Sequence, residues 1–186
     1  MGVYENCPVL GGEKWELRLC AESDAPDLLK VYSDLLAVPL FNSDNCNGDN
    51  FHYTTLERMT EAIRFWQYAY DAKQFVRFSI VNKPENAIVG TVELFNRKSN
   101  DFYSNCGLLR LDLASRFEQQ RNIAEILSLV LDESYLLFEC DMLATKAIDT
   151  AEERIKALAS LGFARGKEPL IGHDGTEYGS YYYRLK

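Results

Sequence analysis

Apolar and polar residues alternate along several short segments of the chain, which is the pattern of β-strands that bury one face. The segment 82–86 reads Asn-Lys-Pro-Glu-Asn and separates two of these runs, so a hairpin is predicted there. Further strands are expected in the second half of the chain. Together the predicted strands cover residues 15–20, 75–81, 87–95, 108–113, the surroundings of Leu143, and 181–183.

Other segments repeat apolar residues every three or four positions, as on the buried stripe of a helix. Asp24 followed by Pro26 predicts the start of a first helix, and Pro39 predicts its end. Thr54 and Glu57 form a capping box for a second helix. The expected buried stripes consist of Leu28, Leu29, Tyr32, Leu35 and Leu36 in the first helix and Leu56, Met59, Ile63, Trp66 and Tyr70 in the second.

Two more helices and two loops complete the predicted order of elements. One helix covers residues 123–138, and another runs into Leu161-Gly162-Phe163, where a left-handed Gly162 would end it. Asp174-Gly175 predicts a tight turn before the last strand. The segment 42–50 is rich in Asn, Asp and Gly, so a mobile loop is expected there.

Composition and charge narrow the class of protein. The 186 residues, 47% hydrophobic and 26% charged, predict one globular domain over 1–186, with 1–14 as an N-terminal extension. The net charge of −8 makes nucleic acid a poor partner, because an acidic surface repels phosphate. The apolar runs are too short for a membrane span, no signal peptide pattern is present, and Asn6 stands where myristoylation needs Ser or Thr. Together these features predict a cytoplasmic protein. The five cysteines form no Cys-x-x-Cys pair, so reduced thiols are expected.

Three short motifs stand in this order of elements. Residues 87–95 read Ala-Ile-Val-Gly-Thr-Val-Glu-Leu-Phe, residues 119–124 read Gln-Gln-Arg-Asn-Ile-Ala, and the last predicted helix ends in Leu-Gly-Phe. From Trp15 onward the chain resembles the GNAT superfamily of acyl-CoA-dependent N-acyltransferases, in particular its RimJ/RimL branch. The resemblance implies an α/β (α+β) fold with a central mixed, mostly antiparallel sheet, helices on both faces, and a splayed parallel strand pair where the strands at Leu113 and Leu143 part.

The resemblance also implies acetyl-CoA as co-substrate, with its pyrophosphate over the loop before the third long helix. A helix N-terminus suits an anion, because its N–H groups are unpaired and its dipole is positive. Asn122 stands where the family has a Gly, and an Asn side chain could cap the helix itself. Without the resemblance, the segment is an ordinary polar helix cap. The cofactor-binding residues implied are Leu111, Leu113, Ala114, Gln119, Gln120, Arg121, Asn122, Ile123 and Ala124. A backbone N–H at Leu113 or Ala114 would polarise the thioester carbonyl.

Glu93 is the candidate general base, because it is an acid in an apolar run where burial would raise its pKa. The alternative is that Glu93 faces solvent. That alternative is favoured for Asp112, which shares a strand face with Arg110. The family's frequent tyrosine acid is replaced by Leu158. Tyr135 or Tyr178 would then have to protonate the departing thiolate, unless solvent does so.

The aromatic residues in and beside the polar loop, Phe41, Phe51 and Tyr53, are the candidate acceptor-binding residues, since the resembled family lines its acceptor pocket with this region. The only histidines, His52 and His173, are far apart and have no metal-ligand spacing, so no metal is expected. Two functions remain open. One is an N-acetyltransferase acting on a small amine or a protein N-terminus. The other is a catalytically silent module that binds a ligand or partner in the same cleft. No membrane partner is expected, and a homodimer is left open.

Overall fold

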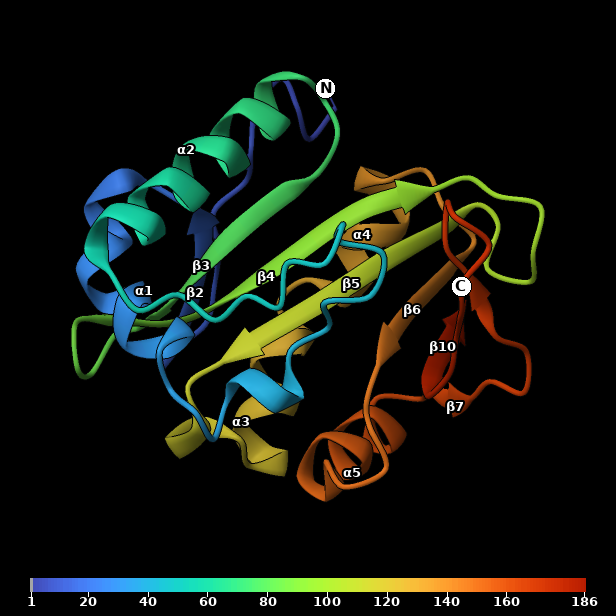
Figure 1. Cartoon of the computed structure of the whole chain (residues 1–186). Coiled ribbons are helices and arrows are strands. Elements are labelled where there is room, and N and C mark those ends of the chain that lie inside the picture. The colour runs from blue at the N-terminus through green and yellow to red at the C-terminus, as the bar shows by residue number, and fades with distance from the viewer. Residues whose placement is uncertain (1) are drawn as a thin grey trace.

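The computed structural model describes residues 2–186 and is built around one sheet of eight strands (Figure 1). The strands lie in the order β1-β2-β3-β4-β5-β6-β10-β7, and the pair β5–β6 is parallel while its neighbours are antiparallel. The strands β8 and β9 form a separate hairpin. The predicted mixed sheet with a parallel strand pair is confirmed. The strands are β1 (Leu10–Gly11), β2 (Trp15–Leu19), β3 (Val76–Asn82), β4 (Ala87–Arg97), β5 (Cys106–Leu113), β6 (Met142–Lys146), β7 (Ala164–Arg165), β8 (Leu170–Ile171), β9 (Glu177–Tyr178) and β10 (Tyr181–Leu185).

Helices cover both faces of the sheet. The α-helices are α1 (Ala25–Tyr32), α2 (Leu56–Asp71), α3 (Gln120–Ser128), α4 (Leu131–Leu137) and α5 (Glu152–Ser160). Short 3-10 helices lie at η1 (Glu22–Asp24), η2 (Val38–Leu40) and η3 (Ser115–Phe117). Within residues 2–186, no helix has the length and apolar character that crossing a membrane requires.

The parallel pair separates along its length, as predicted. The β5–β6 ladder runs from Cys106↔Met142 to Leu109↔Thr145 and stops there. On its other edge, β5 stays paired with β4 as far as Leu113. The last part of β5 therefore has a partner on one side only, and we call the place where β5 and the chain after β6 part the cleft.

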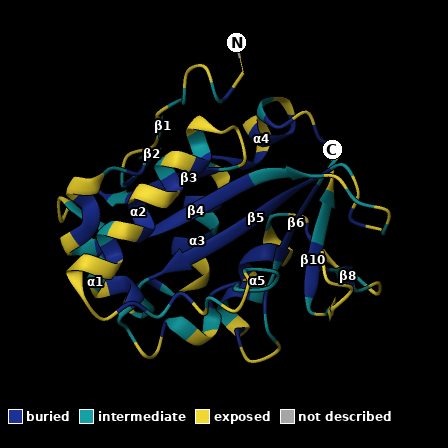
Figure 2. Ribbon diagram, turned by 45° about the horizontal axis from the view of Figure 1, so that its top comes forward, coloured by how far each residue is buried: buried dark blue, intermediate teal, exposed yellow. Residues whose placement is uncertain are grey.

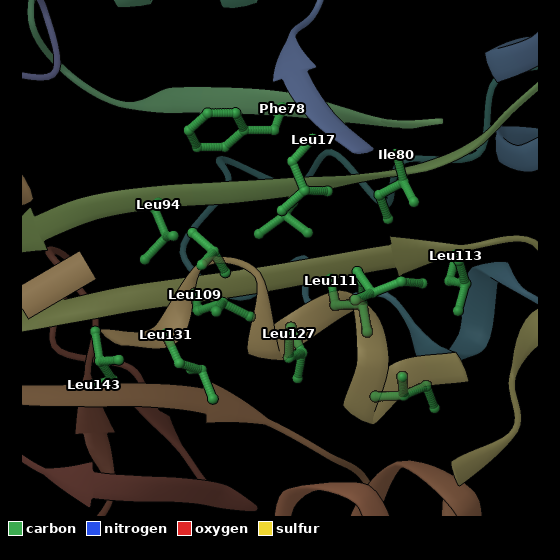
Figure 3. Close-up of a cluster of buried hydrophobic side chains, with 14 of the residues drawn as sticks. Leu17, Phe78, Ile80, Leu94, Leu109, Leu111, Leu113, Leu127, Leu131 and Leu143 are labelled. Atoms are coloured by element: carbon green, nitrogen blue, oxygen red, sulfur yellow. The ribbon is translucent and has the colours of Figure 1, made fainter. Parts of the chain in front are cut away.

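Alternation along the central strands gives the sheet two different faces. Leu109, Leu111 and Leu113 of β5 belong to the main apolar core, with residues of α3 and α4 (Figure 3). Arg110 and Asp112 have the opposite parity and lie beneath α1 and α2. Figure 2 shows that β4 and β5 are buried along most of their length, while α1 and α2 turn exposed residues outward. Helices thus cover both faces of the sheet. The face toward α3 and α4 presents apolar side chains, and the face toward α1 and α2 presents charged ones.

Gly90 allows the two longest strands, β4 and β5, to approach each other closely. A Cβ atom at this position would lie 2.2 Å from the Asp112 carbonyl oxygen. The register between β3 and β4 also shifts next to Gly90, between Ile80 and Val81, which is a β-bulge. A larger residue at position 90 would push β4 away from β5 and disturb the charged face of the sheet.

The first helix ends earlier than predicted. It stops at Tyr32 instead of continuing to Pro39, and Leu35 and Leu36 are exposed. The Asp34 carboxylate accepts hydrogen bonds from the backbone N–H of Leu36 (3.0 Å) and of Ser115 (3.0 Å). This side chain offers the backbone a partner outside the helix, which ends the helical pattern.

Two other helix predictions need correction. Thr55, not Thr54, caps α2, since its hydroxyl accepts from the Arg58 N–H at 3.2 Å. Leu56 then lies on the exposed side, and the buried face consists of Met59, Ala62, Ile63, Trp66 and Ala69. The predicted helix 123–138 is two helices, because the Val130 N–H bonds the carbonyl three residues earlier (3.0 Å) and tightens the chain between α3 and α4.

The predicted turns at Gly162 and Gly175 are confirmed. Gly162 has φ +83° and follows α5, and the Phe163 N–H donates back to the Leu158 carbonyl at 3.0 Å. Gly175 has φ +85° between β8 and β9. The last predicted strand, 181–183, lies within β10.

The segment between α1 and α2 crosses in front of β5 (Figure 1). The Asp44 carboxylate accepts from Lys146 Nζ of β6 at 2.6 and 2.7 Å and from the Tyr181 hydroxyl of β10 at 3.1 Å. The Asp44 carbonyl accepts from Arg110 Nη2 of β5 at 2.9 Å. The segment predicted to be a mobile loop is thus bonded to three strands and forms a wall over the sheet.

Candidate functional site

Three charged side chains stand next to one another on the face of the sheet beneath α1 and α2. Arg77 of β3 is in register with Glu93 of β4, and Glu93 is in register with Arg110 of β5. Both oxygens of the Glu93 carboxylate are used: Arg77 Nη2 donates to Oε2, and Arg110 Nη1 donates to Oε1 at 2.6 Å. All three side chains are buried. We call Arg77, Glu93 and Arg110 the charged row.

Asp112 adds a second carboxylate beside the charged row. Its Oδ2 accepts from Arg77 Nη1 at 2.9 Å and from the Tyr32 hydroxyl at 2.7 Å. The Tyr32 hydroxyl also lies 2.8 Å from Thr91 Oγ1. The two guanidinium groups of the row balance its own carboxylate and that of Asp112, which is the condition under which ionised groups are tolerated inside a protein. Through Tyr32, the network ties α1 to the sheet.

The arginines hold Glu93 in its ionised form. Burial raises the pKa of Glu93, but the charges of Arg77 and Arg110 and their hydrogen bonds outweigh burial, so its pKa lies below the ordinary value. The predicted raised pKa of Glu93 is therefore wrong. That prediction rested on the apolar neighbours along β4, whereas the arginines that lower the pKa lie on the two adjacent strands. The solvent-facing alternative is wrong for both Glu93 and Asp112, which are buried. A carboxylate stabilised by two cations is a weak proton acceptor.

A cavity of about 380 Å³ opens above the charged row. Its floor includes all three residues of the row, and α2 and the segment 45–53 form its walls. Asp49 and Arg58 form an ion pair in this wall at 3.0 Å. The volume lies in the range of small-molecule sites, about 300–1,000 Å³. Aromatic residues of the lining are Phe51, Tyr53, Phe65, Trp66 and Phe75.

Two of the three predicted acceptor-binding residues reach this cavity. Phe51 and Tyr53 line it, whereas Phe41 packs its ring on the Tyr32 ring, 5.3 Å between centroids, inside the core beneath α1. Phe51 has φ +58°, which is unusual for a bulky side chain. The Asp49 carboxylate accepts the Phe51 N–H at 2.8 Å and supports this conformation. Backbone strain of this kind is concentrated at functional sites in proteins.

Aromatic rings cover the Arg77 end of the row. The Arg77 guanidinium lies 4.2 Å from the centre of the Trp66 ring and 5.4 Å from that of Phe51. Cation–π contacts at these distances favour a charged group that has left water. Within residues 2–186, Nε of Arg77 and Nε of Arg110 have no hydrogen-bond partner. The row therefore keeps two unused donors.

Neither tyrosine predicted as an acid lies at the charged row. Tyr135 is on α4, on the opposite face of the sheet, and its hydroxyl donates to the carbonyls of Arg184 and Leu185 at 3.2 Å each. Tyr178 lies on β9 and is not among the residues that line the cavity. The structure does not bring these two hydroxyl groups together with Glu93, so a catalytic role for either has no geometric support.

The cleft between β5 and β6 is filled from the side by Arg154, in the first turn of α5. Arg154 is only 3% exposed, and its Nη1 donates to the carbonyls of Leu111 (2.9 Å) and Leu40 (2.8 Å). Its Nη2 forms an ion pair with Glu118. The hollow that remains beside Leu40, Glu118 and residues 150–154 measures about 230 Å³, which is below the usual range for small-molecule sites, about 300–1,000 Å³.

The start of α3 coincides with the predicted phosphate loop, and two of its residues, Gln120 and Asn122, already bond other parts of the chain. The Gln120 N–H donates to Glu153 Oε2 at 2.9 Å. The Asn122 side chain is buried: its Nδ2 donates to the Phe117 carbonyl at 3.3 Å, and its Oδ1 accepts from Lys14 Nζ at 2.8 Å. Asn122 therefore faces the protein rather than the cleft.

The rest of the loop is likewise occupied within the chain. The Ile123 N–H donates to the Gln119 carbonyl at 3.0 Å, which is an ordinary helical bond. Arg121 is exposed and pairs with Glu125 at 2.7 Å. Ala124 packs against the main core. None of these groups points to a separate anion site.

Two of the groups predicted to contact acetyl-CoA at the end of β5 have partners within the chain. The Ala114 N–H donates to the Val89 carbonyl at 2.9 Å, so the prediction that it could polarise a thioester is wrong. Leu113 lies opposite Gly90 with its side chain in the core, and the Leu111 carbonyl is bonded to Arg154. The Gln120 and Ala114 N–H groups and the Leu111 carbonyl, which belong to residues predicted to hold acetyl-CoA, are thus bonded within the chain.

Sequence reasoning missed Arg77, the member of the row with the most partners. A signal for it was present: the hairpin turn at 82–86 places Arg77 opposite Glu93, and alternation puts both on the same face as Arg110. The role of Arg154 had no such signal, because its partners Leu40, Leu111 and Glu118 are all remote from it in sequence.

Acidification is expected to destabilise the protein through its buried carboxylates. For both Asp24 and Glu93, burial raises the pKa but cationic and hydrogen-bond partners lower it further, below the ordinary values of 3.8 and 4.5. A lowered folded-state pKa stabilises the fold above the unfolded value and loses that effect as the pH falls toward the folded value. The urea midpoint should therefore be nearly constant from about pH 7 to 5 and drop below about pH 4.5. A midpoint that stays level down to about pH 3 would contradict this assignment.

Comparisons with known proteins agree with the fold. No known family model and no curated protein matches the chain. Solved structures do match. A GNAT-family acetyltransferase from Bacillus anthracis is 13% identical with TM-score 0.67, covering 96% of this chain and 98% of that one. RimL, a ribosomal L7/L12 α-N-protein acetyltransferase in complex with coenzyme A, is 14% identical with TM-score 0.69 and the same coverage.

A third match is the ribosomal-protein-S5-alanine acetyltransferase of Vibrio fischeri, 18% identical with TM-score 0.65 and covering 96% of each chain. At these identities the likeness shows the fold alone. The chain has the fold of the GNAT acetyltransferases over nearly its whole length, as the element order predicted.

Proposed function

We propose that the protein is an acyl-CoA-dependent N-acetyltransferase that transfers an acetyl group to a primary amine held in the cavity above the charged row. One observation carries the proposal: two neighbouring residues of β5 face the cavity and the edge of β5 that β6 leaves unpaired. Arg110 lines the cavity on the α1/α2 face, and the carbonyl of Leu111, the next residue, lies in the cleft beside β6. An acceptor in the cavity would be placed next to a donor in the cleft.

The lining of the cavity supports an acceptor that carries an apolar or aromatic group beside its amine. Rings of Phe51, Tyr53, Phe65 and Trp66 provide apolar contact area. The carboxylates of the lining, Glu93 and Asp49, are each paired with an arginine of the same lining, so the apolar rings carry the choice of acceptor. Both a small amine and a peptide N-terminus can carry an apolar group beside the amine.

The likeness to solved structures supports the reaction class. RimL was solved with coenzyme A, and its name describes acetylation of a protein α-amino group. The present chain shares that fold over nearly its whole length. The proposal takes acyl transfer from this likeness and the acceptor class from the cavity.

A second function is a catalytically silent module that binds a ligand in the same cavity. The observation that favours it is the engagement of the cleft by Arg154 and Glu153, which occupy the Leu111 carbonyl and the Gln120 N–H that an acyl donor would use. In that case the cavity would bind the same class of amine without transfer.

The test is an acetylation assay with purified protein, acetyl-CoA, and a panel of aromatic and aliphatic amines and short peptides with free N-termini. Thiol release and mass spectrometry would report the product. Phe65 lines the cavity and is 55% exposed, so Phe65→Ala can be made without emptying the core. This variant should raise the KM for the best acceptor about five- to tenfold, which corresponds to about 1 kcal/mol of lost apolar contact.

Tyr68→Ala is the matched control, because Tyr68 lies on the same helix, is 64% exposed, and does not line the cavity. It should leave the KM unchanged. If no amine in the panel is acetylated while the aromatic amines bind in a Phe65-dependent manner, the silent module replaces the enzyme as the function.

A further inference from the structure

We propose that the first turn of α5 closes the acyl-donor cleft from within, so that Arg154, Glu118 and Glu153 compete with a CoA-type ligand for the same groups. The inference rests on the proposed function for the class of ligand, a thioester carrier with a diphosphate. The closing residues themselves are read from the contacts of this chain.

Arg154 occupies the position where β5 loses its partner. The last pair of the β5–β6 ladder is Leu109↔Thr145, and Leu111 lies beyond it. An extended ligand in the cleft would lie along the unpaired edge of β5 and donate hydrogen bonds to the backbone carbonyls of that edge. Arg154 Nη1 already donates to the Leu111 carbonyl at 2.9 Å. The guanidinium therefore takes the acceptor that the cleft would offer to a ligand.

The same side chain fastens the opposite wall of the cleft. Arg154 Nη1 also donates to the Leu40 carbonyl in η2 at 2.8 Å, and its Nη2 pairs with Glu118 before α3. Three separate segments thus meet on one guanidinium group. Arg154 and Glu118 are both nearly buried, so the pair is held in a water-poor setting where it does not dissociate easily.

Glu153 closes the second half of the cleft, at the N-terminus of α3. Its Oε2 accepts the Gln120 N–H at 2.9 Å. The hydrogen bond from Gln120 and the charge of Lys156 lower the pKa of Glu153 below its ordinary value, so it is anionic at neutral pH. A carboxylate at a helix N-terminus uses the N–H groups and dipole that would favour a phosphate. An incoming diphosphate would have to displace this charge and would be repelled by it.

The consequence is a cleft that admits a CoA-type ligand only in the fraction of molecules whose α5 turn has moved away. Apparent affinity falls in proportion to that fraction, so a cleft open in about one molecule in ten binds about tenfold more weakly than a permanently open one. Removing the closing side chains should recover this factor.

The experiment measures binding of coenzyme A by isothermal titration calorimetry. The main variant, Arg154→Ser with Glu118→Gln, removes both members of the buried pair and leaves neither charge alone. Its matched control is Arg165→Ser with Asp149→Asn, which removes an exposed pair. The Arg154/Glu118 variant should bind coenzyme A about tenfold or more tightly than the wild type, and the control should bind as the wild type does.

A second variant keeps the test decisive if the first one does not fold. Glu153 is half-buried at the surface and lies outside the core, so Glu153→Gln removes the competing charge without touching the core, and it should also tighten binding. Equal affinity in the wild type and in both the Arg154/Glu118 and the Glu153 variants would overturn the inference, whether binding is strong in all or absent in all.

The two proposals fail in different ways. If the opened variants bind coenzyme A but acetylate no amine, the closure stands and the acetyltransferase does not. If the wild type acetylates an amine and its affinity for coenzyme A matches that of the variants, the enzyme stands and the closure does not.

Discussion

Replacing Arg77 with Met is expected to lower the free energy of unfolding by about 3–5 kcal/mol, because it leaves buried carboxylates without their cation. Arg77 is nearly inaccessible, and it donates both to Glu93 and to Asp112. Met fills much of the same space, so the loss would measure charge pairing more than a cavity. A loss of this size is a large part of the stability of an ordinary domain, about 5–15 kcal/mol.

Urea denaturation followed by circular dichroism would measure the change. Arg64→Met is the control, because Arg64 pairs with Glu22 at the surface of α2 and should leave the midpoint almost unchanged. Arg77→Lys should fall between the two, since a Lys keeps the charge but lacks the planar fork that serves Glu93 and Asp112 together. If the Arg77→Met protein is as stable as the Arg64→Met protein, the ion pairs of Arg77 with Glu93 and Asp112 do not stabilise the fold as inferred.

Local patterns predicted most of the fold, because the spacing of apolar residues and the residues that end helices and strands are properties of short segments. The strands from 75 to 95 and the turn between them follow from alternation and a polar, proline-containing stretch, and Gly162 was recognisable as a helix end. The errors arose where a side chain far away, or a backbone bond, overrode the period. Asp34 ended α1 by bonding Ser115, which is remote in sequence.

The site was predictable only in part, for a related reason. Phe51 and Tyr53 could be placed at the acceptor side because aromatic residues in a polar loop are conspicuous. The lowered pKa of Glu93 could not be predicted from the sequence of β4, because Arg77 and Arg110 contact Glu93 from the two neighbouring strands. An apolar run predicts a raised pKa, whereas two cations across the ladder lower it. Pairing between strands, not composition within one, decides the chemistry of such a carboxylate.

The charged row also explains how the two proposed halves of the site depend on each other. Arg110 bonds Glu93 at the cavity floor and the Asp44 carbonyl in the segment that crosses β5. Asp44 in turn bonds Lys146 of β6, beyond the cleft. A disturbance of the row would therefore reach the wall of the cleft through Asp44. Loss of acetyl transfer in a variant of the row is not by itself proof of a catalytic group.

Glu93→Gln separates a structural role from a catalytic one. The neutral amide leaves Arg77 and Arg110 facing each other with less compensating charge, so the free energy of unfolding should drop by about 3–5 kcal/mol. A positioned base would behave differently: its removal lowers turnover about 10²- to 10⁴-fold and alters the pH profile, with no need for a loss of stability. Because the pKa of Glu93 is lowered by its two cations, we expect the loss of stability and an unchanged pH profile in the folded fraction.

A double-mutant cycle with Arg110→Met identifies the cause of that loss. If Glu93 stabilises the fold mainly by pairing, the double variant should be more stable than the sum of the single effects predicts, by about 1–3 kcal/mol. Arg77 then remains paired with Asp112, so the double variant can still fold. Two results together would contradict this view: additive losses in the cycle, and a Glu93→Gln variant of full stability with a displaced pH profile. Glu93 would then act as the base, and the charged row would not be a stabilising set of ion pairs.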